Sequence, residues 1–315
     1  MKFLYGYDQE HYVDISNKVF DKCLTDTQIY IPSDDNVRCS IFGDPFLGIV
    51  KHILIIDSAG IEHKFSHNKD ITISFESISN QLIKESIPKK WINLDYANPV
   101  DKLSKIQSRL DITYGTFVDE YPEQLLATTF INKDNKVLEL GGNIGRNTMI
   151  IAMILNDAKD LVTLECDGDI AQQLKYNIES NGLDCHIVNA ALSHIQLVQR
   201  GWETKPLLNN VIPDGWKEVP TISFENLVKK YKVKFDTLVA DCEGALYYIL
   251  RDDPDMLNDI NLIILENDFS DVSHKMAVDK IFEIKGFKCI QRDKGIPAAA
   301  WSPCYEYFYE VWKKI

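Results

Sequence analysis

The chain has 315 residues, of which 45% are hydrophobic and 26% charged, and this ordinary globular composition suits one large or two smaller domains. The formal net charge of −13 and the pI of about 5.0 argue against nucleic acid and anionic lipid as partners, because an acidic surface repels phosphate groups. No apolar run approaches the ~20 residues that a membrane helix needs, so no membrane insertion is expected.

Residues 1–78 are predicted to form a small β-rich, sandwich-like domain. Short apolar runs separated by turn residues are typical of strands. Four such runs occur here: YVDI (12–15), QIYI (28–31), HILIID (52–57) and ITISF (71–75). The last run alternates apolar with hydroxyl side chains, which predicts one buried and one solvated face.

Residues 79–110 are polar and predicted to be a helical connector interrupted by Pro88 and Pro99. From residue 111 to 315, apolar strands alternate with helices, which predicts a doubly wound α/β domain with a parallel sheet covered on both faces. The predicted strands are 136–140, 161–165, 185–189, 235–240 and 261–266, with closing runs at 287–292 and 304–312. The predicted helices are 123–131, about 147–156, one that begins near 169, 223–231, 244–250 and 272–285. The stretch 200–216 is predicted to be a loop.

Three signals fall at predicted strand ends, where a doubly wound sheet binds its ligands. The first is the glycine-rich sequence ELGGNIG (139–145), and the second is Glu165, 24 residues after Gly141. The third is DCEG (241–244), which ends the fourth strand. Each could be a structural turn, but their common placement favours a cofactor site.

The glycine spacing selects among cofactors. Aligning a dinucleotide motif on Gly142 and Gly145 places Leu140 where the motif needs its first glycine, which disfavours NAD. No G-x-x-x-x-G-K-[ST] sequence is present, which excludes a triphosphate loop of that type. A cofactor that has an adenosine and no phosphate remains, and S-adenosylmethionine fits this description. Glu165 would hold its ribose hydroxyls.

The stretch from about 122 to 312 resembles the FkbM family of S-adenosylmethionine-dependent methyltransferases. Family members carry D-x-G-A-N-x-G, E-P, K-x-D-x-E-G and an apolar strand that ends in Glu, and this chain has ELGGNIG, EC, VADCEG and LIILE in that order. Cys166 replaces the family proline and Val239 the family lysine. The resemblance implies a class I methyltransferase fold, Rossmann-like, with seven strands of which the last is antiparallel.

The resemblance also implies a cofactor site. Gly141 and Asn143 would lie along the methionine portion, Glu165 on the ribose, and the strand end Asn189 and Ala190 beside the adenine. A simple turn is an equally good interpretation of Asn189. The full predicted set of cofactor contacts is Glu139, Gly141, Gly142, Asn143, Gly145, Glu165, Cys166, Asn189, Ala190 and Asp241.

Methyl transfer to oxygen needs an acceptor in line with the sulfonium and a group that takes its proton. The predicted catalytic residues are Asp241, Glu243, Asp268 and His274, although Glu243 could instead cap its helix and His274 could lie on an exposed helix face. An alternative is that Asp241, Glu243 and Asp268 hold a Mg²⁺ ion that acidifies a sugar hydroxyl.

The predicted function is O-methylation of a sugar hydroxyl in a glycan or glycan precursor. Trp202 and Trp216 in the predicted loop, and Trp301 in another, could stack on sugar rings or anchor the loops. The alternatives are a methyltransferase for a non-sugar small molecule and a non-catalytic glycan-binding or assembly protein that retains the fold.

Two N-terminal segments, YGYDQEHYVDIS and IFGDPFLGIVK, are similar to segments of polysaccharide-modifying proteins of bacteria and large viruses. The similarity implies a homo-oligomer contact or glycan binding, and a structural cap is the alternative. The seven scattered cysteines include no CxxC pair, which predicts free thiols, no zinc site and a reducing, cytoplasmic location.

Overall fold

The computed structural model describes residues 1–8, 10–25, 28–57, 60–74 and 98–315. The chain divides into two compact units, Met1–Asn93 and Leu94–Ile315. Most of the predicted connector, 79–110, lies outside the described residues. Its described part is the helix α4 (Pro99–Gln107), which packs against α5 (Tyr121–Phe130) and therefore belongs to the second unit.

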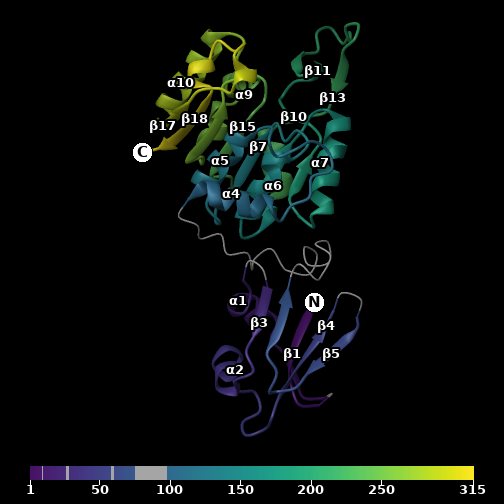
Figure 1. The fold of residues 1–315 in the computed structure, drawn as a ribbon. Coiled ribbons are helices and arrows are strands. Elements are labelled where there is room, and N and C mark those ends of the chain that lie inside the picture. Colours follow the sequence, from purple (N-terminus) through teal and green to yellow (C-terminus); the bar gives the residue numbers. More distant parts are fainter. Residues whose placement is uncertain (9, 26–27, 58–59, 75–97) are drawn as a thin grey trace. The chain divides into compact units, whose positions relative to one another are not determined.

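In its described residues, the N-terminal unit contains two antiparallel sheets and two helices (Figure 1). The strands β1 (Lys2–Gly6), β2 (Tyr12–Asp14), β4 (His52–Ile56) and β5 (Glu62–Phe65) form a sheet of order β2-β1-β4-β5. The strands β3 (Gln28–Ile31) and β6 (Ile71–Ser74) form the second sheet. The helices α1 (Ser16–Lys22) and α2 (Asp35–Phe42) were not predicted, so the unit is β-rich but not built from strands alone.

The second unit is built on a seven-stranded sheet of order β17-β18-β16-β15-β7-β8-β9. The strands are β7 (Val137–Leu140), β8 (Leu161–Leu164), β9 (His186–Val188), β15 (Thr237–Ala240), β16 (Leu262–Glu266), β17 (Phe287–Asp293) and β18 (Tyr309–Lys314). The first five are mutually parallel, whereas β18 is antiparallel to both of its neighbours. This confirms the predicted doubly wound sheet of seven strands with the last one antiparallel.

The inner strands of this sheet are buried throughout, because helices cover both of its faces. The helices α4, α5, α6 (Arg146–Ile154) and α7 (Gly168–Ser180) are on the face turned to the viewer in Figure 1. On the opposite face, α8 (Phe224–Tyr231), α9 (Leu246–Asp252) and α10 (Val272–Ile284) pack on one apolar core. That core includes Leu140 and Leu164, at the ends of β7 and β8.

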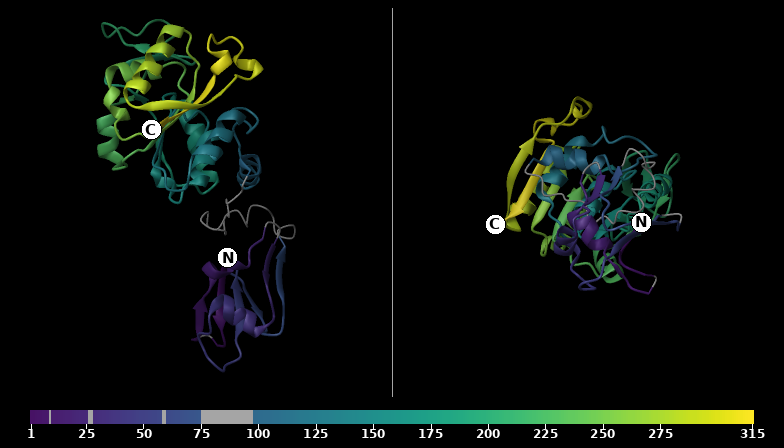
Figure 2. Two further views of the ribbon diagram at one scale, coloured as in Figure 1. Left: turned by 90° about the vertical axis from the view of Figure 1, so that its left-hand side faces the viewer. Right: turned by 60° about the horizontal axis from the view of Figure 1, so that its bottom comes forward.

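The prediction of a loop at 200–216 was wrong in part, because Arg200 and residues 203–206 of this stretch belong to a small antiparallel sheet. The strands β11 (Leu197–Arg200), β12 (Glu203–Pro206) and β13 (Lys217–Val219) pair in the order β12-β11-β13. We call this three-stranded sheet the flap, and Figures 1 and 2 show it projecting from the body of the second unit. Two short strands, β10 (Ala191–Leu192) and β14 (Thr221–Ile222), pair in parallel at its base.

The closing run predicted at 304–312 is only partly a strand. A 3-10 turn, Tyr305–Tyr307, precedes β18, which begins at Tyr309. No helix in the described residues combines the length and the hydropathy needed to span a lipid bilayer.

Candidate functional site

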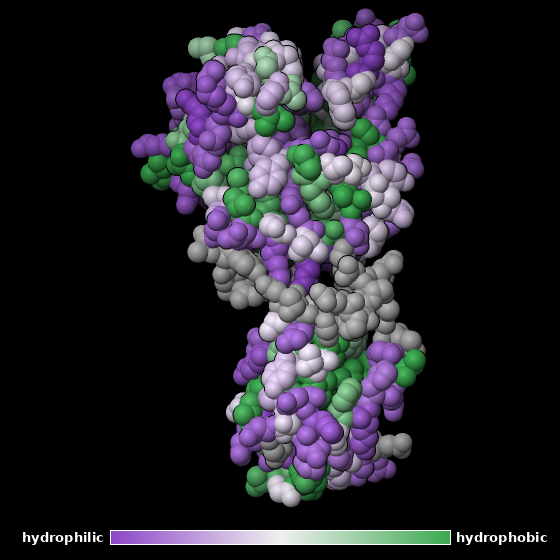
Figure 3. Space-filling model, viewed as in Figure 1, coloured by the Kyte–Doolittle hydropathy of each residue, from purple (hydrophilic) through white to green (hydrophobic). Residues whose placement is uncertain are grey.

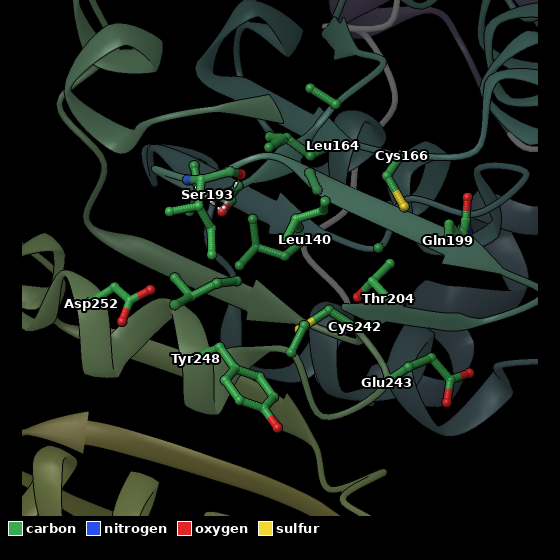
Figure 4. A pocket seen from close by; sticks show the side chains of 18 of the residues that line it. Leu140, Leu164, Cys166, Ser193, Gln199, Thr204, Cys242, Glu243, Tyr248 and Asp252 are labelled. Carbon is green, nitrogen blue, oxygen red and sulfur yellow. Dashed lines mark hydrogen bonds between the residues drawn. The ribbon is translucent and has the colours of Figure 1, made fainter. Parts of the chain in front are cut away.

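A cleft of about 220 Å³ opens at the carboxyl ends of the parallel strands. It lies where the strand order reverses, because β8 and β9 extend to one side of β7 while β15 and β16 extend to the other. Residues at four strand ends line it: Leu140 and Gly141 at the end of β7, Glu165 after β8, Ala190 after β9 and Asp241 after β15. Figure 4 shows side chains from these strand ends and from the flap pointing into the cleft.

The first glycine of the loop is required by close packing. Gly141 has a φ of +85°, and a Cβ atom there would lie 1.5 Å from the backbone carbonyl oxygen of Asp241. Gly145 has a φ of +96° and lies against Leu174 of α7, so it brings α6 and α7 together. Gly142 is likewise enclosed, since its Cβ would lie 2.3 Å from Thr163 Oγ1. The loop therefore lets β7, β15 and α7 meet at one point beside the cleft.

Glu165 connects this loop to the next strand end. Its carboxylate accepts hydrogen bonds from the backbone N–H of Asn143 at 3.0 Å and of Asp167 at 2.8 Å. The side chain is 7% exposed, and burial raises the pKa of Glu165 despite these two donors. Each carboxylate oxygen has a second lone pair, so Glu165 can still accept hydrogen bonds from a ligand in the cleft.

The predicted adenine side of the site is only partly in the cleft. Cys166 and Ala190 line it, and burial raises the pKa of the Cys166 thiol to about 12, so this cysteine is a neutral wall. Asn189 is exposed and is not among the lining residues. Its Nδ2 atom donates to the backbone carbonyls of Glu165 at 2.8 Å and Cys166 at 3.2 Å. Asn189 thus holds the backbone at Glu165 and Cys166 in place and does not itself face the cleft.

Three further predicted cofactor residues are not at the surface of the cleft. Gly142, Gly145 and Glu139 do not line the cleft. Glu139 is 2% exposed, and its Oε2 atom accepts a hydrogen bond from Thr148 Oγ1 at 2.6 Å. Burial raises the pKa of Glu139 to about 7.

The four predicted catalytic residues are in different surroundings. Asp241 and Glu243 line the cleft, and burial followed by the charge of Asp268 raises the pKa of Asp241 well above its ordinary value. Asp268 accepts a hydrogen bond from the Gly244 backbone N–H at 2.7 Å, and burial together with Glu243 raises the pKa of Asp268 to about 7. His274 is not a lining residue and stacks on Tyr247, with ring centroids 3.9 Å apart.

The acidic group best placed to hold a metal differs from the predicted one. Among the described residues, one set of three carboxylates has ligand atoms within 4.8 Å of one another, and it consists of Glu123, Asp241 and Glu266. It shares only Asp241 with the predicted set of Asp241, Glu243 and Asp268. Glu123, in the first turn of α5, was not predicted, because only the folded sheet brings that helix to the strand ends.

The flap contributes the outer wall of the cleft. Gln199, Trp202, Thr204 and Lys205 line it, and Trp202 is 56% exposed. Trp216 instead lies beneath two cations of the flap, with Lys205 Nζ 3.8 Å and the Arg200 guanidinium 4.9 Å from its ring. Trp216 therefore anchors the flap, whereas Trp202 is free to meet a ligand. The surface of the flap mixes hydrophilic residues with a few hydrophobic ones (Figure 3).

The strand order and the cleft at its switch point define a class I methyltransferase fold, Rossmann-like. No known protein-family model and no curated protein sequence matches the chain. Solved structures with similar folds include a ribosomal protein L11 methylase from Lactobacillus delbrueckii subsp. bulgaricus, which is 11% identical, with 65% of this chain and 84% of that chain covered and a TM-score of 0.40. A protein of the NADB-Rossmann superfamily from Streptococcus agalactiae is 14% identical, with 61% and 67% covered and a TM-score of 0.38.

Proposed function

We propose that this protein is an S-adenosylmethionine-dependent methyltransferase. One observation carries the proposal: three carboxylates line the cleft beside the glycine loop, at the switch point of the sheet. They are Glu165, Asp241 and Glu243. S-adenosylmethionine has a sulfonium and an ammonium group, and negative charge around them is favourable. The apolar side chains of Leu140, Leu164 and Phe224 line the same cleft and suit the flat face of an adenine.

The same charge distribution disfavours the rival dinucleotide. A pyrophosphate carries negative charge and needs backbone N–H donors or cations beside it. In the glycine loop, the Asn143 N–H already donates its hydrogen bond to Glu165, so it is not available to donate to a phosphate. A NAD-linked oxidoreductase is therefore the less favoured candidate.

The acceptor proposed here is a sugar hydroxyl of a glycan or glycan precursor, as the FkbM resemblance implies. The exposed ring of Trp202 and the polar side chains of Gln199 and Thr204 support this, because sugars combine apolar ring faces with hydroxyl groups. The hydroxyl oxygen would attack the methyl carbon in line, the carbon–sulfur bond would break, and the sulfonium would leave as a neutral thioether. Glu243, exposed in the cleft, is proposed to accept the hydroxyl proton.

Calorimetric titration with S-adenosylmethionine, and in parallel with NAD, tests the cofactor. We expect heat of binding from the first and none from the second. Binding of NAD alone, or of neither compound at protein concentrations adequate for micromolar affinity, would overturn the proposal.

Transfer of a labelled methyl group to a panel of sugars and oligosaccharides tests the acceptor. Glu243→Gln should lower turnover by roughly 100-fold or more, because general base catalysis contributes about 10²–10⁴, and this loss should exceed any loss of S-adenosylmethionine affinity. Cofactor binding without transfer to any sugar would support a different acceptor or the non-catalytic alternative.

For the N-terminal unit we propose a contact between copies of this chain. Leu47 is 89%, Val50 56% and Ile49 42% exposed, so this short segment presents apolar side chains to solvent. Light scattering of the full chain and of a Leu47→Ser/Val50→Ser variant tests this. A monomeric wild type, or an unchanged oligomer in the variant, would contradict the proposed contact and leave glycan binding as its alternative.

A further inference from the structure

A second, small cavity of about 10 Å³ lies beside the cleft, and five of the residues that line it are acidic. Leu140, Gly141 and Asp241 line both cavities, so the two are neighbours. The remaining wall comes from α5 and the residue before it, and from α6, β7, β15, β16 and β18. Its acidic members are Glu120, Glu123, Glu139, Asp241 and Glu266. The volume is enough for one atom-sized ligand such as a water molecule or an ion.

Strand register explains why these side chains converge. Val239 of β15 pairs with Glu139 on one side and Ile264 on the other, so the three side chains project from the same face. Two residues further along their strands, Asp241 and Glu266 therefore lie on that face as well. Glu266 pairs with Tyr309 of β18, so the Tyr309 side chain projects from the same face and also lines the cavity.

Helix α5 closes the cavity from above this face of the sheet, since it packs against β16 and β18. Its first turn supplies Glu123, which is 7% exposed. One carboxylate oxygen from each of Glu123, Asp241 and Glu266 lies within 4.8 Å of the other two. Two ligands on opposite sides of a cation are separated by twice the metal–oxygen distance, about 4.2 Å for Mg²⁺ and about 5 Å for Ca²⁺. The spacing therefore matches a hard divalent cation.

Two buried oxygen atoms around this cavity lack a partner. Glu123 Oε2 and the side-chain carbonyl oxygen Oδ1 of Asn147 accept no hydrogen bond, and Asn147 is 8% exposed. In the part of the chain that the structure describes, no basic side chain forms an ion pair with Glu123, Asp241 or Glu266. A proton shared between two carboxylates would leave the Asn147 carbonyl unsatisfied, whereas a cation can satisfy every oxygen at once.

We propose that this cavity binds one divalent metal ion through Glu123, Asp241 and Glu266, with Asn147 as a further oxygen ligand. The donor set contains only oxygen, which selects Mg²⁺, Mn²⁺ or Ca²⁺ over metals that prefer nitrogen or sulfur. Since Asp241 also lines the large cleft, the ion would be held next to the cofactor site. The alternative occupant is the ammonium group of a bound cofactor, which would need no metal.

Binding of Mn²⁺ to the full chain, freed of metal with EDTA and then desalted, tests this proposal. Electron paramagnetic resonance measures free Mn²⁺, and we expect one Mn²⁺ to be bound per chain. Glu123→Gln and Glu266→Gln should each weaken binding by at least about 10-fold, because even groups that only orient metal ligands typically contribute 10- to 100-fold. Glu179→Gln is the matched control, since this exposed carboxylate at the end of α7 lines neither the cavity nor the cleft.

Two further measurements distinguish a loss of Mn²⁺ binding from a failure of the variant to fold. In EDTA, Glu123→Gln should melt at or above the wild-type temperature, because it removes repulsion between carboxylates, and Mn²⁺ should no longer raise that temperature. Val239→Lys places a fixed cation at the wall of the same cavity and should also abolish Mn²⁺ binding. No Mn²⁺ binding by the wild type, or equal binding by wild type and Glu123→Gln, would overturn the proposal. The assay contains no S-adenosylmethionine, so its result is independent of the proposed function.

Discussion

A hydrogen bond of 3.0 Å joins the backbone N–H of Asn143 to the carboxylate of Glu165 and so ties the glycine loop after β7 to the end of β8. The other carboxylate oxygen of Glu165 holds the N–H of Asp167, at the start of α7. One buried side chain thus fixes the two segments between which the cofactor is proposed to lie.

Replacing Glu165 should therefore weaken cofactor binding. Glu165→Ala removes the proposed ribose acceptor and leaves two backbone N–H groups without their partner, so we expect S-adenosylmethionine affinity to fall by roughly 10-fold or more. Glu165→Gln, which keeps one oxygen, should have an intermediate effect. Calorimetry measures both, and Glu179→Gln at the exposed end of α7 is the control. Equal affinity in wild type and Glu165→Ala would refute the ribose assignment.

Gly141 should not tolerate even a methyl group. The added Cβ would lie 1.5 Å from the Asp241 carbonyl oxygen, and the φ of +85° is strained for any other residue. We expect Gly141→Ala to lower the free energy of unfolding by about 3 kcal/mol or more, from overpacking and backbone strain together. Urea denaturation measures this change.

Gly182→Ala is the comparison for that prediction. Gly182 has a φ of +60°, but nothing lies within 4 Å of the position that a Cβ atom would take there, so only strain of about 1 kcal/mol should result. If both variants lost the same free energy of unfolding, the close contact between the ends of β7 and β15 would not contribute to the cost of Gly141→Ala.

The parts of the fold that could be predicted from sequence are those with an uninterrupted apolar signal. The strands β7, β8, β15 and β16 are buried at nearly every position, so each appears as a continuous hydrophobic run. The flap was missed because β12 (ETKP) and β13 (KEV) are short and polar, and only their pairing with β11 makes them strands. The helix α2 was missed because it begins among the turn residues that follow the predicted strand 28–31, where Asp34 caps it by accepting the Val37 N–H.

The candidate site divides in the same way. Gly141, Glu165 and Asp241 were predicted because each follows an apolar strand directly. Glu123 could not be predicted, since its place depends on how α5 lies across β16 and β18. Whether a strand-end carboxylate faces the cleft or the small cavity depends on strand register, which a single sequence does not specify.

The buried carboxyl group of Glu139 should make the protein less stable as the pH rises. Burial raises the pKa of Glu139 to about 7, above the ordinary value of 4.5, so the native state keeps a proton that the unfolded state has lost. Stability should therefore fall between about pH 4.5 and pH 7. Glu139→Gln, which cannot ionise, should flatten this decline, as measured by melting temperatures at pH 5 and pH 8. Glu283→Gln, on an exposed position of α10, should leave the slope unchanged.

Glu310 in β18 should have the opposite pH dependence. It is fully buried, and it meets Lys275 Nζ at 2.9 Å, Arg292 Nε at 2.6 Å and Trp312 Nε1 at 3.0 Å. Burial alone would raise the pKa of Glu310, but Lys275 and the hydrogen bonds outweigh it and hold the pKa below its ordinary value. The stabilising charge is thus present above about pH 4.5 and lost as the pH falls through the lowered pKa.

Glu310→Gln should accordingly destabilise the protein by up to about 3 kcal/mol at pH 7, because the buried Lys275 loses its carboxylate partner on β18 and keeps Asp279. The difference from wild type should shrink below pH 4, where the wild-type carboxylate begins to take up its own proton. Glu306→Gln is the control, since its pair with Lys294 is exposed and screened by solvent and should contribute little to stability. Urea denaturation at pH 7 and pH 4 measures both. An equal loss for the two variants would mean that the buried network around Lys275 adds nothing beyond an exposed ion pair.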